Sequence, residues 1–261
     1  MSNAQGPMDF HRPPAIVRSF ERLFSLSAEE REHLDRITCA GEEIEPRRKL
    51  IVEGKPCRSL HLLTSGWLVE SKQLRDGTRQ ILNLRLPGDV VGIECLAYKN
   101  ALHSTAALTP CTVTTLSFEQ FQEIQRDFPR LAAALFLMTL LEGAILHEWE
   151  VNLGRRAAFP RVAHFLLELD RRLHLRGLGI GAAVPFPLTQ QEIADCVGLT
   201  TPYVNRILQQ MRAKGMIELE NRLLTIREPA LLAKAAGFKP DYIDHWGEGW
   251  FGQVLNEPQP D

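Results

Sequence analysis

The sequence lacks several features that would place it in a common class. Its five cysteines form no C-x-x-C pair, so we predict neither a zinc site nor a disulfide framework, and we expect reduced thiols in a cytoplasm. No basic segment followed by an apolar one opens the chain, and we therefore expect no export signal. The longest uncharged apolar run, residues 131–141, is about half of what a membrane-spanning helix needs. These absences predict a cytoplasmic globular protein.

The composition is that of a folded chain with an uneven charge. Of 261 residues, 44% are hydrophobic and 24% are charged, which excludes wholesale disorder and allows two small domains. The net charge is −2, yet residues 155–228 hold 11 Lys/Arg against 7 Asp/Glu. This local excess of +4 indicates an anionic partner for that segment alone.

Turn glycines divide the first half into short segments. They recur at intervals of 11 to 13 residues, at Gly41, Gly54, Gly66, Gly77 and Gly88. The pair Asp76-Gly77 separates two alternating stretches and predicts a hairpin with a type I′ turn. Short strands at this spacing, continuing through residues 112–117, predict an antiparallel β-roll of the jelly-roll kind. We assign it residues 21–128, with Ser27 capping a first helix and a short helix over residues 119–127.

Residues 129–154 are predicted to form one long helix that joins two subunits. Pro129 suits its first turn, and residues 130–153 contain no proline and only one glycine, Gly143. The helix is apolar around most of its circumference, so two of its faces need cover. One face suits the β-roll, and an identical helix from a second subunit suits the other; a helix buried inside a monomer is the alternative. A heptad pattern assigns the dimer interface to Leu131, Leu135, Met138, Ile145 and Trp149.

The most informative stretch lies in residues 155–236 and predicts a winged helix-turn-helix. Thr189 caps a short helix with Glu192 at the capping-box position. Gly198 makes a tight turn, and Thr200 caps a second helix that has Pro202 in its first turn. Two short strands around residues 220–221 complete a wing. The overall class is thus α+β, with an N-terminal β-roll, a long helix and this C-terminal module.

Such a second helix can enter the major groove of DNA. Its polar surface includes Thr201, Tyr203, Asn205 and Arg206, and Arg206 can donate two hydrogen bonds to guanine. Thr189 and Gln191, at the start of the first helix, suit a phosphate. A helical hairpin used for protein contact is the alternative, but the caps, the wing and the positive charge favour double-stranded DNA.

Taken together, these segments resemble the CRP/FNR family of bacterial transcription regulators. The resemblance covers roughly residues 20–236 and is strongest in residues 188–215 and in the P-G-D-V-V-G sequence of residues 87–92. It implies a non-enzymatic homodimer that binds a near-palindromic promoter site and recruits or obstructs RNA polymerase. It places Thr201, Pro202 and Arg206 at base-reading positions, and Thr189 and Gln191 at phosphate contacts. Pro202 stands where many members have a Glu, so their usual half-sites are not expected here.

The resemblance also points to an effector pocket, which departs from the family pattern. By alignment its residues are Gly92, Ile93, Glu94, His103, Ser104, Leu146 and His147. Ile93 replaces the Glu that holds the ribose in cyclic-AMP binders, and His103 replaces their phosphate-binding Arg. Glu94 is one position out of register, on the opposite face of an expected strand. These changes argue against cyclic AMP, and the lack of cysteine in residues 1–38 argues against the iron–sulfur cluster of oxygen-sensing members.

Several points stay open at this stage. No cofactor and no metal site are predicted, and an unknown small-molecule effector is left open. A redox role for Cys95 or Cys111 is also open. Residues 1–20 are interpreted as an arm that begins with a cloning remnant, and residues 237–261 as a tail without a function. The rival functions are a β-roll module that acts through protein contacts and a jelly-roll metalloenzyme, although the latter usually needs a His pair on one strand.

Overall fold

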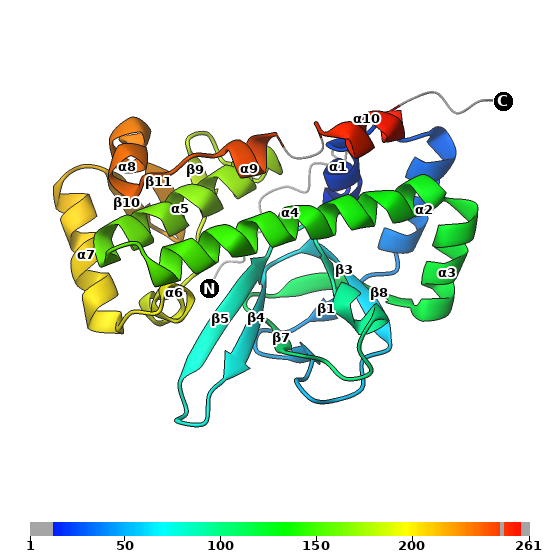
Figure 1. The fold of residues 1–261 in the computed structure, drawn as a ribbon, viewed down its shortest axis with the longest axis horizontal. Coiled ribbons are helices and arrows are strands. Elements are labelled where there is room, and N and C mark those ends of the chain that lie inside the picture. The colour runs from blue at the N-terminus through cyan, green and yellow to red at the C-terminus, as the bar shows by residue number, and fades with distance from the viewer. Residues whose placement is uncertain (1–12, 246–247, 257–261) are drawn as a thin grey trace.

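The computed structural model describes residues 13–245 and 248–256 of the chain. A long helix, α4 (Pro129–Gly154), crosses the molecule, with a β-domain below it and a smaller helical domain at its C-terminal end (Figure 1). The expected cloning remnant in residues 1–4 lies outside the described residues. The α+β class predicted from the sequence is confirmed.

The β-domain consists of two four-stranded antiparallel sheets. One sheet has the order β1-β8-β3-β6 and the other the order β2-β7-β4-β5. The strands are β1 (Glu42–Ile44), β2 (Lys49–Ile51), β3 (Ser59–Ser65), β4 (Leu68–Gln73), β5 (Arg79–Arg85), β6 (Val90–Val91), β7 (Ser104–Ala107) and β8 (Cys111–Ser117). Apolar side chains such as Leu63, Leu68 and Val91 are fully buried between the sheets.

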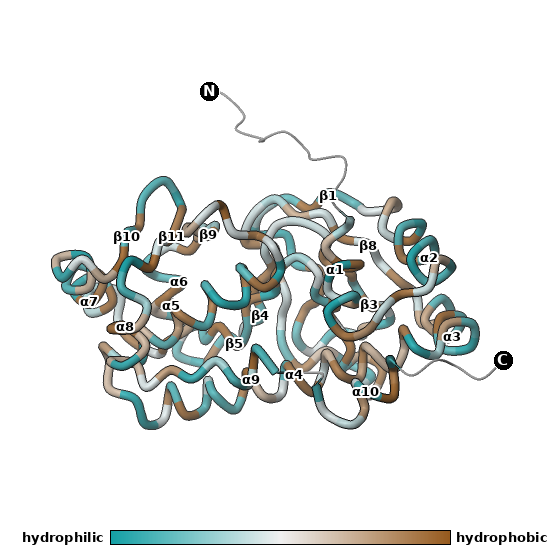
Figure 2. Tube along the Cα trace, turned by 90° about the horizontal axis from the view of Figure 1, so that it is seen from above, coloured by the Kyte–Doolittle hydropathy of each residue, from teal (hydrophilic) through white to brown (hydrophobic). Residues whose placement is uncertain are grey.

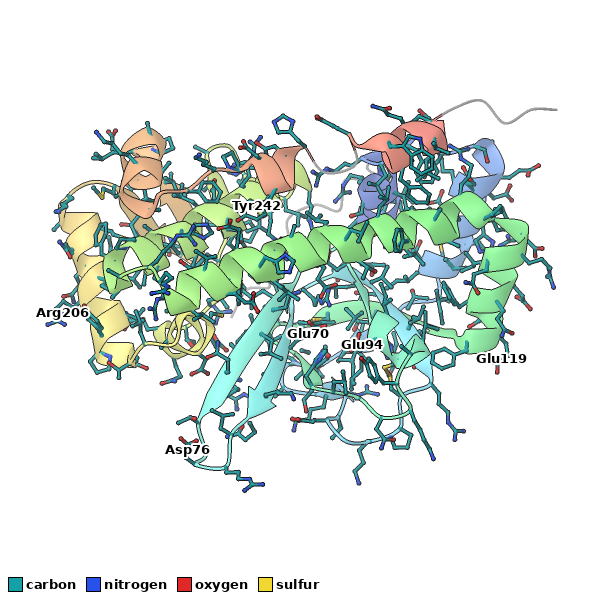
Figure 3. The ribbon with its side chains drawn as sticks, viewed as in Figure 1. Glu70, Asp76, Glu94, Glu119, Arg206 and Tyr242 are labelled. Atoms are coloured by element: carbon teal, nitrogen blue, oxygen red, sulfur yellow. A yellow bond between two sulfur atoms is a disulfide. The ribbon has the colours of Figure 1, made fainter. Side chains whose placement is uncertain are left out.

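The β4–β5 hairpin is longer than the sequence suggested. Gln73 pairs with Arg79, so residues 74–78 form a five-residue loop. Gly77 has the expected positive φ of 86°, but Asp76 does not have a positive φ. A type I′ turn requires a positive φ at both central residues, so the predicted turn type is wrong. Asp76 instead accepts hydrogen bonds from the backbone and side chain of Thr78, a side-chain turn that competes with the two-residue form. The loop projects from the body of the β-domain (Figure 3).

Three shorter helices lie beside the β-domain: α1 (Ala15–Glu21), α2 (Ala28–Thr38) and α3 (Phe118–Asp127). Ser27 caps α2 with Glu30 in a reciprocal capping box, as predicted. The segment interpreted as an arm ends in α1, whose Ile16 and Val17 are fully buried. A Cβ at Gly88 would lie 2.1 Å from Ser19 Oγ and 2.8 Å from the carbonyl oxygen of Ala15. Gly88, with φ of 95°, therefore allows α1 to pack directly on the β-domain.

The face of α4 that the heptad pattern assigned to a dimer contact packs inside this chain instead. Leu131 and Leu135 belong to the core shared with α1 and α3, and Ile145 and Trp149 belong to the core of the C-terminal domain. Met138 is half-buried and lines a cavity. The predicted assignment of Leu131, Leu135, Ile145 and Trp149 to a dimer interface is wrong, because these four side chains are buried within the chain. The assignment of Met138 stays a prediction.

A different face of α4 is covered only in part, by α9 (Asp241–Asp244) and α10 (Trp250–Asn256). Its exposed apolar side chains are Phe136, Leu140, Leu146 and Val151, which are 56%, 54%, 38% and 46% exposed. By length and composition α4 is long and apolar enough to cross a membrane, with a mean hydropathy of 1.6 in its best 18-residue window and only 22% of that window buried. A largely uncovered apolar helix of this kind requires a partner surface.

The C-terminal domain contains helices α5 (Ala158–Leu175), α6 (Gln190–Val197), α7 (Thr201–Ala213) and α8 (Pro229–Ala236). A three-stranded sheet of order β10-β11-β9 completes it, with β9 (Ala183–Pro185), β10 (Ile217–Glu220) and β11 (Leu223–Ile226). Its core is continuous with Val69, Ile81 and Leu84 of the β-domain. Part of the β-domain therefore shares a hydrophobic cluster with the C-terminal domain.

The tail beyond residue 237 folds back along α4. It forms α9 (Asp241–Asp244) and α10 (Trp250–Asn256), and Figure 2 shows α10 lying beside the end of α4 that is close to α3. Phe251 contacts Phe136 edge to face with ring centroids 5.8 Å apart. Asn256 donates to the Leu23 carbonyl oxygen at 3.1 Å, which ties the tail to the N-terminal helices.

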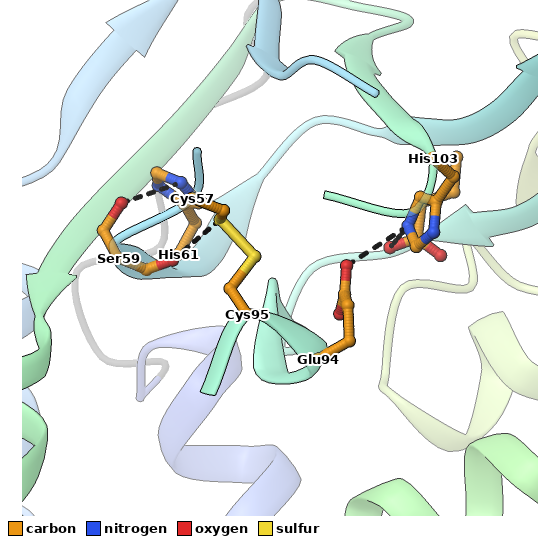
Figure 4. Close-up of a disulfide and its surroundings, with 7 residues drawn as sticks. Cys57, Ser59, His61, Glu94, Cys95 and His103 are labelled. Carbon is orange, nitrogen blue, oxygen red and sulfur yellow. Dashed lines mark hydrogen bonds and ion pairs between the residues drawn. A yellow bond between two sulfur atoms is a disulfide. The ribbon is translucent and has the colours of Figure 1, made fainter. Parts of the chain in front are cut away.

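The expectation of reduced thiols fails for one pair of cysteines. Cys57 and Cys95 form a disulfide with their Cα atoms 5.5 Å apart (Figure 4). It links the segment between β2 and β3 to the 3-10 helix η1 (Ile93–Leu96). The two residues are 38 positions apart, so spacing motifs could not pair them; their proximity comes from the packing of the β-domain. Cys111 is free and buried, and burial raises the pKa of its thiol.

Candidate nucleic-acid interface

The first helix of the pair, α6, is fixed at both ends by local sequence. Thr189 Oγ1 accepts from the Glu192 backbone N–H at 3.2 Å, and Glu192 accepts from the Thr189 N–H at 2.7 Å, so the predicted capping box is confirmed. At the other end Gly198 adopts a left-handed conformation with φ of 62°. This residue ends α6 and turns the chain toward α7.

The second helix, α7, begins without the side-chain cap that the sequence suggested. Thr200 holds the N-cap position, but its hydroxyl makes no capping hydrogen bond. Pro202 in the first turn restricts the backbone to helical φ and lacks an N–H that would need a partner. The buried face of α7 carries Val204, Ile207, Leu208 and Met211, which dock it against α5 and α6.

The exposed face of α7 presents an aromatic and cationic pair. The Arg206 guanidinium lies over the Tyr203 ring, 4.5 Å from the ring centroid. Pro202, Tyr203 and Arg206 are exposed, and Thr201 and Asn205 are half-buried. Figure 3 shows Arg206 pointing away from the body of the molecule. The aromatic face restricts the guanidinium while its N–H donors stay available, as recognition of a guanine edge requires.

Polar side chains at the junction of α6 and α7 hold one another. Thr201 Oγ1 donates to Gln191 Oε1 at 2.6 Å, and Gln191 Nε2 donates to Asp195 at 2.7 Å. Gln190 contacts Asn205 at 3.4 Å. Thr189 and Gln191, the predicted phosphate contacts, are both exposed. The predicted DNA-contacting residues therefore lie at one end of the domain and on one surface.

The wing extends from the same domain. β10 and β11 pair from Ile217↔Ile226 to Glu220↔Leu223, and the turn between them has positive φ at Asn221 and Arg222. Arg222 is exposed there and adds a cation. The hydrogen-bonded Arg227–Glu218 pair, at 2.6 Å, spans the wing strands.

The residues predicted for an effector pocket are only partly brought together. His103 Nε2 lies 3.4 Å from Glu94 Oε1 (Figure 4) and 3.6 Å from Glu70 Oε1. The nearby Glu70 carboxylate is the main cause that raises the pKa of His103. Glu94 lies on η1 and not on the expected strand. The prediction that strand register turns its side chain away from the pocket was therefore wrong. Two carboxylates face the imidazole where a cyclic phosphate would need unpaired cations, and the residues present do not fit that ligand.

Leu146 and His147 lie elsewhere. Both are exposed on α4, whereas the face of α4 toward the β-domain carries Met138, Leu141 and Glu142. Both side chains are turned outward in the single chain, so their assignment to the effector pocket stays a prediction.

Sequence reasoning missed a buried charge network between the β-domain and α4. Arg85, on β5, donates to Glu70 at 2.7 Å and also contacts Glu142 of α4. Burial alone would raise the pKa of Glu70, but Arg85 and His103 outweigh it and lower that pKa. Burial raises the pKa of Glu142. The sequence contained one signal of this network. Arg85 is a charged residue at a position where the strand pattern places a core side chain, and a buried charge needs a partner.

Two family descriptions match the two parts of the chain. A cyclic nucleotide-binding domain matches residues 42–127, and a Crp-like helix-turn-helix domain matches residues 160–235. The fumarate nitrate reduction regulatory protein of Klebsiella oxytoca is 27% identical over 216 residues, covering 82% of this chain and 85% of the relative. The anaerobic regulatory protein of Pasteurella multocida is 26% identical, with 82% and 78% covered.

Solved structures agree. FixK2 from Bradyrhizobium japonicum superposes with a TM-score of 0.69 at 26% identity, covering 77% of this chain and 98% of the other. The c-di-GMP responsive regulator CLP of Xanthomonas campestris, at 17% identity and a TM-score of 0.61 over 75% and 98% of the chains, shares the fold. The relatives are transcription regulators and not enzymes, which excludes the rival jelly-roll metalloenzyme. The chain belongs to the CRP/FNR family of transcription regulators and carries its helix-turn-helix DNA-binding domain.

Proposed function

We propose that this regulator binds a palindromic promoter site as a cytoplasmic homodimer and controls transcription by contacting RNA polymerase. The observation that carries the proposal is the exposed face of α7, where Tyr203 supports Arg206 at the opposite end of the molecule from α10. Two such helices about 34 Å apart would reach successive major grooves on one side of a duplex.

The dimer in this proposal uses the part of this α4 face that α9 and α10 leave exposed. Phe136, Leu140, Gly143, His147 and Val151 follow one another at spacings of three and four residues, which forms a nearly straight stripe on a helix. A Cβ on Gly143 would meet nothing within 4 Å, so the centre of the stripe is open for close approach. An identical helix is a natural cover because it presents the same apolar stripe.

The proposal also assigns the base contacts. Arg206 would read guanine, Tyr203 and Asn205 would modify the preference, and Pro202 would contribute shape without accepting a hydrogen bond. Thr201 would contact the edge of a neighbouring base, while Thr189 and Gln191 would bind the phosphate backbone of the DNA. In this proposal neither cyclic AMP nor an iron–sulfur cluster controls the regulator. The carboxylates of Glu94 and Glu70 already lie beside the His103 imidazole, where a cyclic phosphate would have to bind. Residues 1–38 contain no cysteine that could hold a cluster.

Selection of binding sites from a random duplex pool tests the proposal. The purified full chain is expected to enrich a palindrome with two half-sites, without added metabolites, and binding should weaken steeply with salt. Enrichment only after addition of a metabolite mixture would contradict effector independence. Enrichment of no site in either condition would contradict sequence-specific binding, and a single half-site would contradict the dimer.

A further inference from the structure

The Cys57–Cys95 disulfide lies beside a groove in the surface of the β-domain. Both cysteines line this groove, whose volume of ≈ 470 Å³ is within the range of small-molecule sites. Residues 96–99, which follow η1, and the first two residues of α3 form the rest of the wall together with residues 56 and 58. Cys57 is 8% exposed and Cys95 is 4% exposed. The bond is therefore shielded from bulk solvent but adjoins a space that a small molecule can enter.

The groove carries cations that no neighbouring side chain neutralises. Arg58 and Lys99 line it, both are exposed, and neither forms an ion pair with another described residue. Glu119 is the one carboxylate among the described residues of the lining. Positive charge beside a cysteine favours the thiolate, which is the form that attacks a disulfide, and it attracts anions. The groove therefore suits a small thiol that carries carboxylates.

Backbone hydrogen bonds hold the two cysteines close to each other independently of their sulfur atoms. The Cys57 N–H donates to the Lys99 carbonyl oxygen at 3.4 Å. The Gly54 N–H donates to the Ala101 carbonyl oxygen at 2.8 Å, and the Ala101 N–H donates to the Lys55 carbonyl oxygen at 2.9 Å. These bonds join the segment before β3 to the segment after η1. Two reduced thiols would thus remain positioned to close the bond again, as a reversible site requires.

The cellular location supports a reversible bond. In the cytoplasm disulfides are rare, and those present are usually transient and serve catalysis or redox sensing. This step rests on the proposed function, which places the chain in the cytoplasm. The free cysteines Cys111 and Cys196 are buried, and burial raises the pKa of both thiols, which keeps them protonated and unreactive.

The bond also restrains Glu94, which precedes Cys95 on η1. Glu94 Oε1 lies 3.4 Å from His103 Nε2 (Figure 4), and the same nitrogen lies 3.6 Å from Glu70 Oε1. Glu70 pairs with Arg85 at 2.7 Å, within the buried charge network that reaches α4. A series of contacts therefore connects the disulfide to the long helix.

We propose that Cys57 and Cys95 form a reversible thiol–disulfide site that reacts with a small anionic thiol, and that the closed bond holds Glu94 beside His103. For oxidation, the thiolate of Cys57, the more exposed cysteine, attacks a small disulfide RSSR and forms a mixed disulfide; RS⁻ leaves and takes up the proton that Cys57 has lost. The Cys95 thiolate then displaces the second RS⁻, which takes up the Cys95 proton. Two electrons pass from the protein to RSSR, and two RSH are released. Reduction by two RSH is the reverse.

Equilibration of the full chain with glutathione, without DNA, tests reversibility. Buffers cover a wide range of ratios of reduced to oxidised glutathione, and acid quenching, alkylation and mass spectrometry measure the fraction of closed bond. This fraction should rise from near zero to near one as the buffer becomes more oxidising, along the same curve from reduced and from oxidised protein. A bond that stays closed, or stays open, at every ratio would overturn the proposal.

Rates of reduction by glutathione and by uncharged 2-mercaptoethanol test the role of the groove. Arg58→Gln and Lys99→Gln should each slow the reaction with glutathione about threefold or more at low salt and leave that with 2-mercaptoethanol unchanged. Arg75→Gln is the matched control, because Arg75 is exposed in the β4–β5 loop and does not line the groove. Equal slowing with both thiols, or in the control, would show that the groove does not select an anionic thiol.

NMR titration of His103 tests the link to Glu94. Glu94 adds to the larger effect of Glu70 in raising the pKa of His103, so reduction should lower that pKa in the wild type and leave it unchanged in Glu94→Gln. Cys95→Ser should reproduce the reduced state, and Cys39→Ser is the control; if Cys95→Ser does not fold, chemical reduction of the wild type gives the value. A His103 pKa that does not respond to reduction would refute the restraint on Glu94. No measurement here contains DNA, so failure of this site is distinguishable from failure of the proposed DNA binding.

Discussion

Arg79 and Asp195 join the β-domain directly to the helix-turn-helix. The two nitrogens of Arg79 on β5 lie 2.8 and 2.6 Å from Asp195 Oδ2 on α6. The neighbouring Gln80 donates to the Cys196 carbonyl oxygen at 3.2 Å. Asp195 also accepts from Gln191, which holds Thr201 at the start of α7. A strand of the β-domain is thus connected through two hydrogen bonds to Gln191, a predicted phosphate contact.

This pair predicts coupling between the two domains. Arg79→Gln and Asp195→Asn should each destabilise the chain, and the double variant should be less destabilised than the sum, with a coupling energy of roughly 1 kcal/mol. Chemical unfolding of the four proteins measures it. If the losses of unfolding free energy in the two single variants simply add up in the double variant, the contact does not couple the domains. Arg75→Gln, in the exposed hairpin loop, serves as a control that does not touch this contact.

Arg206→Ala should remove sequence preference before it removes DNA binding. The loss on the selected site should be about 1–3 kcal/mol, with a much smaller change on random duplex, because the guanidinium reads a base edge. Competition binding at fixed salt compares the two duplexes. The control is Arg212→Ala, an exposed arginine near the other end of α7. Equal losses on both duplexes would contradict the role of Arg206 as a base reader.

Leu140→Arg should convert the proposed dimer into a monomer. A buried charge opposite its own copy is costly, and loss of the second half-site should weaken operator binding about 100-fold or more. Sedimentation shows the mass, and gel shift shows the affinity. Leu74→Arg is the matched control, because Leu74 is similarly exposed, at 53%, but lies in the β4–β5 loop. A Leu140→Arg dimer would place the interface elsewhere.

Acidification should destabilise the fold through His164. Burial, reinforced by Arg156, lowers its pKa to about 4. The unfolded chain therefore binds the proton more readily, and the stabilisation present above pH 6.5 is lost as the pH falls toward about 4, by roughly 3 kcal/mol. His164→Gln should flatten the stability profile in this window. A wild-type profile that is flat between pH 6.5 and 4 would refute the assignment.

Reduction of the Cys57–Cys95 bond should lower stability. A closed loop of 38 residues corresponds to roughly 4 kcal/mol in the chain-entropy account of disulfides. Cys57→Ser should lower the melting temperature in oxidising buffer and make it insensitive to reductant, whereas replacing the exposed Cys39 should do neither. Alkylation of both thiols before any reductant is added would show that the bond is absent.

The sequence predicted most local features correctly, with the type I′ turn at Asp76-Gly77 and the side-chain cap at Thr200 as exceptions, and it predicted packing partners poorly. The caps at Ser27 and Thr189 and the turn at Gly198 depend on neighbouring residues, and they are found where the pattern placed them. The register of α4 and the cysteine pair depend on which surfaces meet in three dimensions. An apolar helix with two apolar faces does not reveal which face the rest of the chain will use. The buried Arg85 was missed for the same reason, since its two carboxylate partners lie 15 and 57 positions away.

The network around Arg85 also constrains how this regulator can diverge. Arg85 forms ion pairs with Glu70 of the neighbouring strand and with Glu142 of α4. Loss of the arginine would therefore leave two acidic groups without a cationic partner. Descendants of this chain should therefore retain the three residues as a set or exchange them together for neutral ones. Among relatives, joint conservation of these three residues would identify the lineages that kept this buried contact between the β-domain and the long helix.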